Sequence, residues 1–169
     1  MKYDYLAIEK KWQEKWEAAG VFRALDEKEA GGKPKFYALV EFPYPSGAGM
    51  HVGHIKAYSG LEVVSRMRRM QGYNVLFPMG FDAFGLPTEN YAIKTGMHPR
   101  AVTDKNIAKF TQQLKRVGYG FDWGRVIDTT DEDYYRWTQW IFLKMFEAGL
   151  AFRDTALVNY CPTCKVVLS

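Results

Sequence analysis

The sequence predicts an α/β fold with parallel strands, and three observations lead to this prediction. An apolar run at 35–42 predicts a buried strand, which enters a Pro/Gly-rich loop at 43–49. Apolar residues then recur at helical spacing over 52–70, and a second apolar run follows at 73–79, within the distance of a βαβ unit. Because parallel strands end at the same edge of a sheet, the loops 43–49 and 80–89 should face one crevice.

Length and composition fit one folded domain. The chain has 169 residues, of which 47% are hydrophobic and 16% aromatic, enough for a real core. The first residues lack the hydrophobic region of a signal peptide, and every apolar run is far shorter than the ~20 residues that span a bilayer. We therefore expect a cytoplasmic protein with no membrane partner. The net charge of +4 permits an RNA or nucleotide partner, but it is also common on ordinary surfaces.

Upstream of this unit, an amphipathic pattern predicts a helix over 5–19 that ends at Gly20 and lies over the core. The polar, Gly-rich stretch 26–34 predicts a loop. The apolar face of the predicted helix consists of Ile8, Trp12 and Trp16.

Two more helices are predicted towards the carboxyl end. Thr103 should cap a helix over 104–117, which Gly118 closes. Thr130 should cap a second helix, which has an acidic first turn and ends at Gly149. Since aromatic stripes at helical spacing are usually buried, we interpret the aromatics of this helix as core residues rather than as a platform for bases. They are Tyr134, Tyr135, Trp137, Trp140, Phe142 and Phe146.

The tetrapeptide HVGH, residues 51–54, lies where the predicted loop meets the 52–70 helix. His51 and His54 can both point at one phosphate chain, and Gly53 leaves room for a flat base. Free N–H groups and the positive end of the helix dipole also favour phosphate there. The alternative is that each histidine is only a helix-end or surface residue, because so short a motif is weak by itself.

Arg66, Arg68 and Arg69 lie at the far end of this helix from His54. Two interpretations stay open: a solvated face favoured by the helix C-terminus, or a contact with nucleic acid.

Cys161 and Cys164 have the spacing of half a tetrahedral zinc site. Two further ligands are needed, and the sequence contains no other cysteine. The alternatives are a structural Zn²⁺ site completed by ligands beyond Ser169, or two free thiols on a turn.

Ordered sequence blocks also give the chain a resemblance to a known family. They are FPYPSG (42–47), HVGH (51–54), DAFGLP (82–87), YYRW (134–137) and VNYCP (158–162). Together they resemble the start of a class I aminoacyl-tRNA synthetase, specifically of the leucyl-tRNA synthetase family. DAFGLP is the discriminating block, because the isoleucine, valine and methionine relatives carry other residues between its Asp and Gly.

The resemblance implies the first half of a Rossmann-like parallel-sheet nucleotide-binding domain, with an N-terminal helix and an aromatic-rich C-terminal helix. Its parts would be a helix and loop at 1–34, the ATP and amino-acid site region at 35–95 and a helical segment at 96–154. Residues 155–169 would begin a Cys-containing knuckle that leads to an insert outside this chain.

The resemblance also implies roles for individual residues. His51 and His54 would hydrogen-bond the phosphates in the transition state, and Asp82 would bind the α-ammonium group of the amino acid. A carboxylate on a strand-end loop suits that task; the alternative is that Asp82 only caps its own loop. Phe42 and Tyr44 would wall the leucine side chain. The residues assigned to ATP are Pro45, Ser46, Gly47, His51, Gly53 and His54.

The activity implied is ATP-dependent activation of leucine, with Mg²⁺, and its transfer to tRNA(Leu) by a monomeric parent enzyme. Nothing in the chain matches the family's KMSKS signature, its editing domain or its anticodon-side domain, so we expect feeble activity from residues 1–169 alone. The competing hypotheses are a nucleotide-binding fragment without turnover and a small HxGH nucleotidyltransferase.

Overall fold

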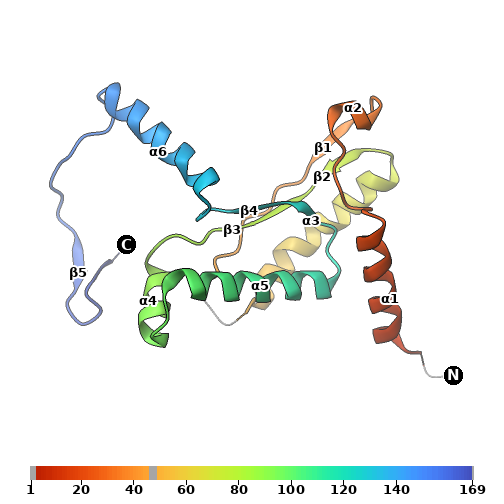
Figure 1. Ribbon diagram of the computed structural model, residues 1–169, viewed down its shortest axis with the longest axis horizontal. Coiled ribbons are helices and arrows are strands. Elements are labelled where there is room, and N and C mark those ends of the chain that lie inside the picture. The colour runs from red at the N-terminus through yellow and green to blue at the C-terminus, as the bar shows by residue number, and fades with distance from the viewer. Residues whose placement is uncertain (1–2, 46–48, 169) are drawn as a thin grey trace. The chain divides into compact units, whose positions relative to one another are not determined.

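The computed structural model describes residues 3–45 and 49–168. The chain divides into two compact units, Met1–Tyr134 and Tyr135–Ser169. The first unit contains α1 (Tyr5–Ala18), α2 (Glu27–Ala30), β1 (Lys35–Tyr37), α3 (Val52–Met70), β2 (Asn74–Leu76), β3 (Pro78–Phe81), α4 (Leu86–Thr95), α5 (Pro99–Val117) and β4 (Asp122–Asp128) (Figure 1). Helix α6 (Glu132–Glu147) leads into the second unit, which contains β5 (Asn159–Cys161) and β6 (Val166–Leu168).

The strands of the first unit are parallel, which confirms the predicted α/β class. β1 pairs with β2, and β3 pairs with β4. Only Phe77 separates β2 from β3, and its carbonyl accepts the N–H of Asp122 at 2.8 Å. The extended segment 74–81 thus lies between β1 and β4, and Pro78, which has no N–H, marks the change of partner.

The expected strand over 35–42 is shorter than predicted. β1 covers Lys35–Tyr37 only, and from there to Glu41 exposed and more buried residues alternate. This alternation is typical of a strand with one covered face, so the prediction of a buried strand over 35–42 was wrong.

The core of this unit forms where α3 and α5 pack against the strands. Tyr58 of α3 and Phe110 of α5 are buried together with Phe77, Phe81 and Phe121. Fully burying such a side chain contributes roughly 1.5–3 kcal/mol, so this cluster fixes both helices on the sheet.

The helix predicted over 5–19 forms as α1, but it does not lie over the core. Ile8 and Trp12 are exposed. Contact comes from the end of the helix: the Trp16 ring meets Phe22 edge-on at 5.8 Å, and Gln13 Nε2 donates to the carbonyl of Arg116 at 3.0 Å.

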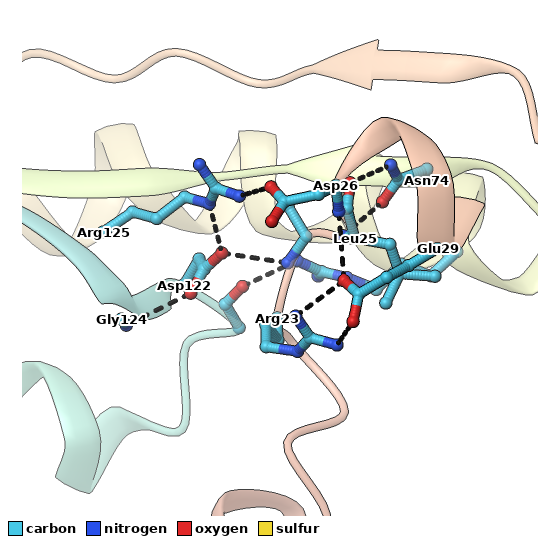
Figure 2. Close-up of polar contacts among 11 residues, drawn as sticks. Arg23, Leu25, Asp26, Glu29, Asn74, Asp122, Gly124 and Arg125 are labelled. Carbon is cyan, nitrogen blue, oxygen red and sulfur yellow. Dashed lines mark hydrogen bonds and ion pairs between the residues drawn. The ribbon is translucent and has the colours of Figure 1, made fainter.

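Polar side chains hold the segment after α1 on the sheet (Figure 2). The buried carboxylate of Asp122 accepts the N–H of Ala24 at 2.9 Å. The Asn74 side chain accepts the N–H of Leu25 at 2.9 Å and donates to its carbonyl at 2.7 Å. Asp122 and Asn74 therefore replace strand pairing in joining residues 24–25 to β4 and β2.

Several predicted helix starts are corrected. The stretch 26–34 is not only loop, because it contains α2. Helix α5 begins at Pro99 with His98 as its N-cap, whereas Thr103 is buried within it. At α6, Asp131 accepts the N–H of Asp133 at 3.1 Å, while Thr130 donates to Asp128. The residues that cap these helices are therefore His98, which comes before Thr103 and is followed by a proline at N1, and Asp131, which comes directly after Thr130.

The second unit is small. β5 and β6 form an antiparallel pair, and no residue of α6 is buried. The prediction that the α6 aromatics are core residues is wrong for the described chain: Trp137, Trp140 and Phe146 are 57%, 52% and 61% exposed. The aromatic side chains of α6 point in all directions around the helix, and the β5–β6 hairpin is too small to cover them. None of the helices in residues 3–45 and 49–168 has the length and hydropathy that a membrane crossing needs.

Candidate functional site

The first turn of α3 is capped by its own two histidines. His51 is the N-cap residue, and its Nδ1 accepts the N–H of Gly53 at 3.1 Å. His54 Nδ1 accepts the N–H of His51 at 3.2 Å, and the two rings stack with centroids 3.9 Å apart. Each Nδ1 therefore uses a lone pair, so a neutral ring must carry its proton on Nε2.

This arrangement changes the expected source of hydrogen bonds at the helix start. The N–H of Gly53 is bonded to His51, and the N–H of His54 donates to the His51 carbonyl at 3.1 Å. These two N–H groups are occupied, so the prediction of free N–H donors at this point was wrong for them. Among the described residues, the two Nε2–H groups remain as side-chain donors for a ligand, close to the positive end of the α3 dipole.

Gly53 is required for this cap. A Cβ at this position would lie 2.9 Å from Cε1 and Nδ1 of His51, closer than side chains pack. At Gly60, further along α3, a Cβ would meet no atom within 4 Å. The His51 ring thus occupies the space above Gly53, so the room predicted there for a flat base is not open in this structure.

The surroundings of His54 favour its neutral form. Burial lowers the pKa of His54, the neighbouring His51 lowers it further, and Glu41 opposes them. The rings of Tyr58 and Phe110 lie 6.0 and 6.3 Å away. Burial also raises the pKa of Tyr58 to about 12, so its hydroxyl stays protonated and donates to the Glu41 carbonyl at 3.1 Å. This bond ties α3 to the loop that follows β1.

The loops after β1 and β3 are joined to each other. The N–H of Asp82 donates to the carbonyl of Pro43 at 3.2 Å, and the Tyr44 hydroxyl donates to the carbonyl of Phe84. The Phe42 ring lies so close to Gly80 that a Cβ there would be 2.5 Å from its Cε2. The two loops therefore lie side by side, as the parallel strands predicted.

The Asp82 carboxylate is exposed, and no group in the described residues hydrogen-bonds it. The next N–H, that of Ala83, donates instead to Thr129 Oγ1 at 2.9 Å. No hydrogen bond among the described residues therefore supports the alternative interpretation, in which the Asp82 carboxylate caps its own loop. Of the other predicted residues, Pro45 is buried beside this loop, whereas Ser46 and Gly47 lie outside the described residues.

Two residues of this region, Glu41 and Tyr58, were missed by sequence reasoning. Their only signal was position: Glu41 precedes the FPYPSG block, and Tyr58 follows His54 by one helical turn. An i, i+4 neighbour of a site histidine is a sound place to look for a supporting side chain.

The cluster of Arg66, Arg68 and Arg69 is structural. Arg66 Nη2 donates to the Gly118 carbonyl at 2.7 Å, and Arg69 Nη2 donates to the Gly120 carbonyl at 2.9 Å. All three guanidinium groups lie over aromatic rings, 4.8–5.4 Å from the centroids. Arg66 and Arg69 thus hold the turn after α5, whereas Arg68 Nη1 donates to Gln71 Oε1 at 3.1 Å. The interpretation as a merely solvated face is therefore wrong for Arg66 and Arg69, and a contact with nucleic acid stays an alternative.

In the second unit, Cys161 is the last residue of β5 and Cys164 lies on the turn that leads to β6. The N–H of Cys164 donates to Cys161 Sγ at 3.3 Å, and this bond lowers the pKa of the Cys161 thiol. Across residues 3–45 and 49–168, no group of three or more His, Cys, Asp or Glu side chains is placed to hold a metal ion. Two thiols are half of the four ligands that a structural zinc site needs, so the described residues alone do not complete such a site.

Known proteins are similar to this chain in sequence and in fold. A model of the family tRNA synthetases class I (I, L, M and V) matches residues 11–169. The leucine–tRNA ligase of Alkaliphilus oremlandii (strain OhILAs) is 59% identical over 168 residues, covering 99% of this chain and 21% of that protein. The leucine–tRNA ligase of Chlorobaculum tepidum is 53% identical and matches 100% of this chain and 21% of its own length. The chain spans about one fifth of these relatives.

Solved structures show the same likeness. The ternary complex of Agrobacterium radiobacter K84 agnB2 LeuRS-tRNA-LeuAMS superposes with a TM-score of 0.88 at 36% identity, over 99% of this chain and 21% of that one. The Mycobacterium tuberculosis methionyl-tRNA synthetase in complex with methionyl-adenylate gives a TM-score of 0.62 at 29% identity, over 69% and 22%. The leucine protein is similar over the larger part of the chain.

Proposed function

Because the chain belongs to the class I tRNA synthetase family for isoleucine, leucine, methionine and valine, we propose that it forms the part of a leucine–tRNA ligase that activates leucine with ATP. The observation that carries the proposal is the pair of reciprocally capped imidazoles at the start of α3. The bond from Tyr58 to Glu41 ties this helix to the strand-end loops that carry Phe42 and Asp82.

In the proposed reaction, the carboxylate of leucine attacks the α-phosphorus of ATP. A bond forms between the carboxylate oxygen and the α-phosphorus, and the bond from that phosphorus to the bridging oxygen of pyrophosphate breaks. Negative charge builds up on the phosphate oxygens, and donors that are already oriented stabilise it without reorganisation. The Nε2–H groups of His51 and His54 supply such donors, because both Nδ1 atoms are held by the helix start.

Leucine is recognised from the neighbouring loops in this proposal. The carboxylate of Asp82, which no described residue pairs, binds the α-ammonium group and leaves the attacking carboxylate free. Phe42 and Tyr44 wall the leucine side chain. Gly80, against which the Phe42 ring lies, fixes the depth of that wall.

The remaining substrates belong to the same proposal. ATP would contact Pro45, Ser46, Gly47 and Gly53 as well as the histidines, and Mg²⁺ would bind its phosphates as an oxygen-liganded cation. Transfer of leucine to tRNA(Leu) needs the rest of the ligase, since the chain spans only about one fifth of its relatives. We expect the ligase to act in the cytoplasm as a monomer.

The test uses a host ligase, defined as the Alkaliphilus oremlandii relative with residues 1–169 in place of its matching segment. ATP–pyrophosphate exchange is measured with leucine, isoleucine, valine and methionine in parallel. The proposal requires exchange that is fastest with leucine. Exchange with none of the four would leave a nucleotide-binding segment without turnover, and exchange with a non-amino-acid substrate would favour the nucleotidyltransferase.

A further inference from the structure

We propose that α5 positions the two histidines of the proposed ATP site through a two-point clamp, formed by Asn106 and Gln113. The clamp holds the backbone on both sides of residues 46–48, which lie outside the described residues. This inference rests on the proposed function, and it adds two positioning residues to which neither the motifs nor the family likeness assigns a role.

Asn106 forms the first point. Its side chain is 5% exposed, and its Nδ2 donates to the carbonyl of Pro45 at 2.8 Å. The bond is buried and joins residues 61 positions apart. A buried carbonyl that loses its donor costs about 1–3 kcal/mol, so this bond ties the end of the first loop segment to α5.

Gln113 forms the second point with the opposite polarity. Its Oε1 accepts the N–H of Met50 at 2.9 Å. Met50 directly precedes His51, the N-cap of α3. The Gln113 amide also lies against Gly49, where a Cβ would be 2.9 Å from Nε2.

The two points of the clamp and a contact to His54 lie on the same face of α5. Asn106 and Gln113 are seven residues apart, which is two helical turns or about 10 Å along α5. Phe110 lies between them, is 1% exposed, and meets the His54 ring at 6.3 Å. One face of α5 thus touches the chain before the loop, the chain after it and a histidine ring.

These contacts constrain the positions of the two Nε2–H donors. The position of His51 follows from Met50, and the position of His54 follows from the His51 cap and from Phe110. Donors to developing charge must be placed within about 0.5 Å, and a misplacement of about 1 Å can cost as much as a hundredfold in rate. Loosening the clamp should therefore lower kcat, while leucine binding through Asp82 on the other loop is kept.

The experiment compares substitutions that keep or remove the required polarity in the host ligase. Gln113→Leu removes the acceptor, whereas Gln113→Glu keeps an acceptor for Met50. Asn106→Asp removes the donor and places an acceptor against the Pro45 carbonyl. Gln112→Leu, at the exposed neighbouring position of α5, is the matched control.

Two readouts are taken from each variant: steady-state exchange with leucine, and deuterium uptake without substrates in the peptide covering 49–58. Gln113→Leu should lower kcat by about tenfold or more with KM for leucine within about twofold, and should speed uptake by about tenfold. Gln113→Glu should restore slow uptake, Asn106→Asp should lower kcat, and Gln112→Leu should change neither readout. Uptake in the 74–81 segment reports global unfolding. If Gln113→Leu unfolds, Asn106→Asp decides: a kcat equal to that of wild type would then overturn the clamp.

Unchanged uptake in Gln113→Leu, or faster uptake with full kcat, would overturn the clamp. A host ligase that shows no leucine-dependent exchange before any substitution refutes the proposed function instead. In that case deuterium uptake still decides whether Gln113 holds the start of α3.

Discussion

At the scale of single residues, the imidazole rings of His51 and His54 each have two roles. Nδ1 caps the helix and Nε2–H remains for a ligand. The motif predicted these residues and their place at a helix start. It did not predict the reciprocal cap, because the tautomer depends on backbone geometry that a tetrapeptide does not specify.

Gly53 gives the first prediction. Gly53→Ala places a Cβ against the His51 ring and should release the cap, whereas Gly60→Ala meets no atom within 4 Å. Gly60→Ala should raise the free energy of unfolding by about 0.5–1 kcal/mol, as expected for Ala in place of Gly in a helix. Gly53→Ala should lack this gain, because the lost cap costs about 1 kcal/mol. Chemical denaturation of both variants measures the difference; equal stabilisation would show that the His51 cap contributes nothing.

Asp82 gives the second. Asp82→Asn keeps the shape but removes the charge proposed to pair with the leucine ammonium, so KM for leucine should rise by about tenfold or more. KM for ATP should stay near that of the wild type in exchange assays of the host ligase. Glu89→Gln, an exposed acid on α4, is the control. A loss of ATP affinity instead would mean that Asp82 supports its loop.

At the scale of elements, the boundaries of the helices were predicted better than the contacts between distant elements. Helices α1 and α3 appear where apolar spacing and a following glycine placed them, because these signals are local. Strand β4 was not predicted, since its parallel partner β3 is more than 40 residues away and only Asp122 of its own residues is buried. The clamp residues Asn106 and Gln113 were missed for the same reason: a polar residue on a helix does not reveal its distant partner.

The stability of the folded chain should depend on pH through His54, at the start of α3. The pKa of His54 is lowered in the folded chain, chiefly by burial, so the unfolded chain binds the proton more readily. The stability from this group is complete above the ordinary histidine pKa of about 6.5 and is lost as pH falls through the lower, folded value. Between about pH 7.5 and pH 5, the unfolding temperature should therefore fall more steeply for wild type than for His54→Ala. Parallel curves for the two proteins would contradict this.

At the scale of the whole molecule, much apolar surface of the first unit is uncovered. Tyr37 and Leu39 near β1 and Val63 and Met67 on α3 are exposed. Parallel sheets are usually covered on both faces, so this surface fits a chain that spans about one fifth of its relatives. Purified residues 1–169 should therefore self-associate in sedimentation experiments and show exchange at least about a hundredfold slower than the host ligase. Brisk exchange by a monomeric chain would show that it is sufficient alone.

The histidine pair is tested by leucine-dependent ATP–pyrophosphate exchange in the host ligase with His54→Ala. If His54 Nε2–H stabilises the charge that develops on the phosphates, kcat should fall by about a hundredfold. KM for ATP should change little, because the ground state gains less from this donor than the transition state. An unchanged kcat in a variant that unfolds at the same temperature as wild type would contradict the assignment of His54 to the reaction.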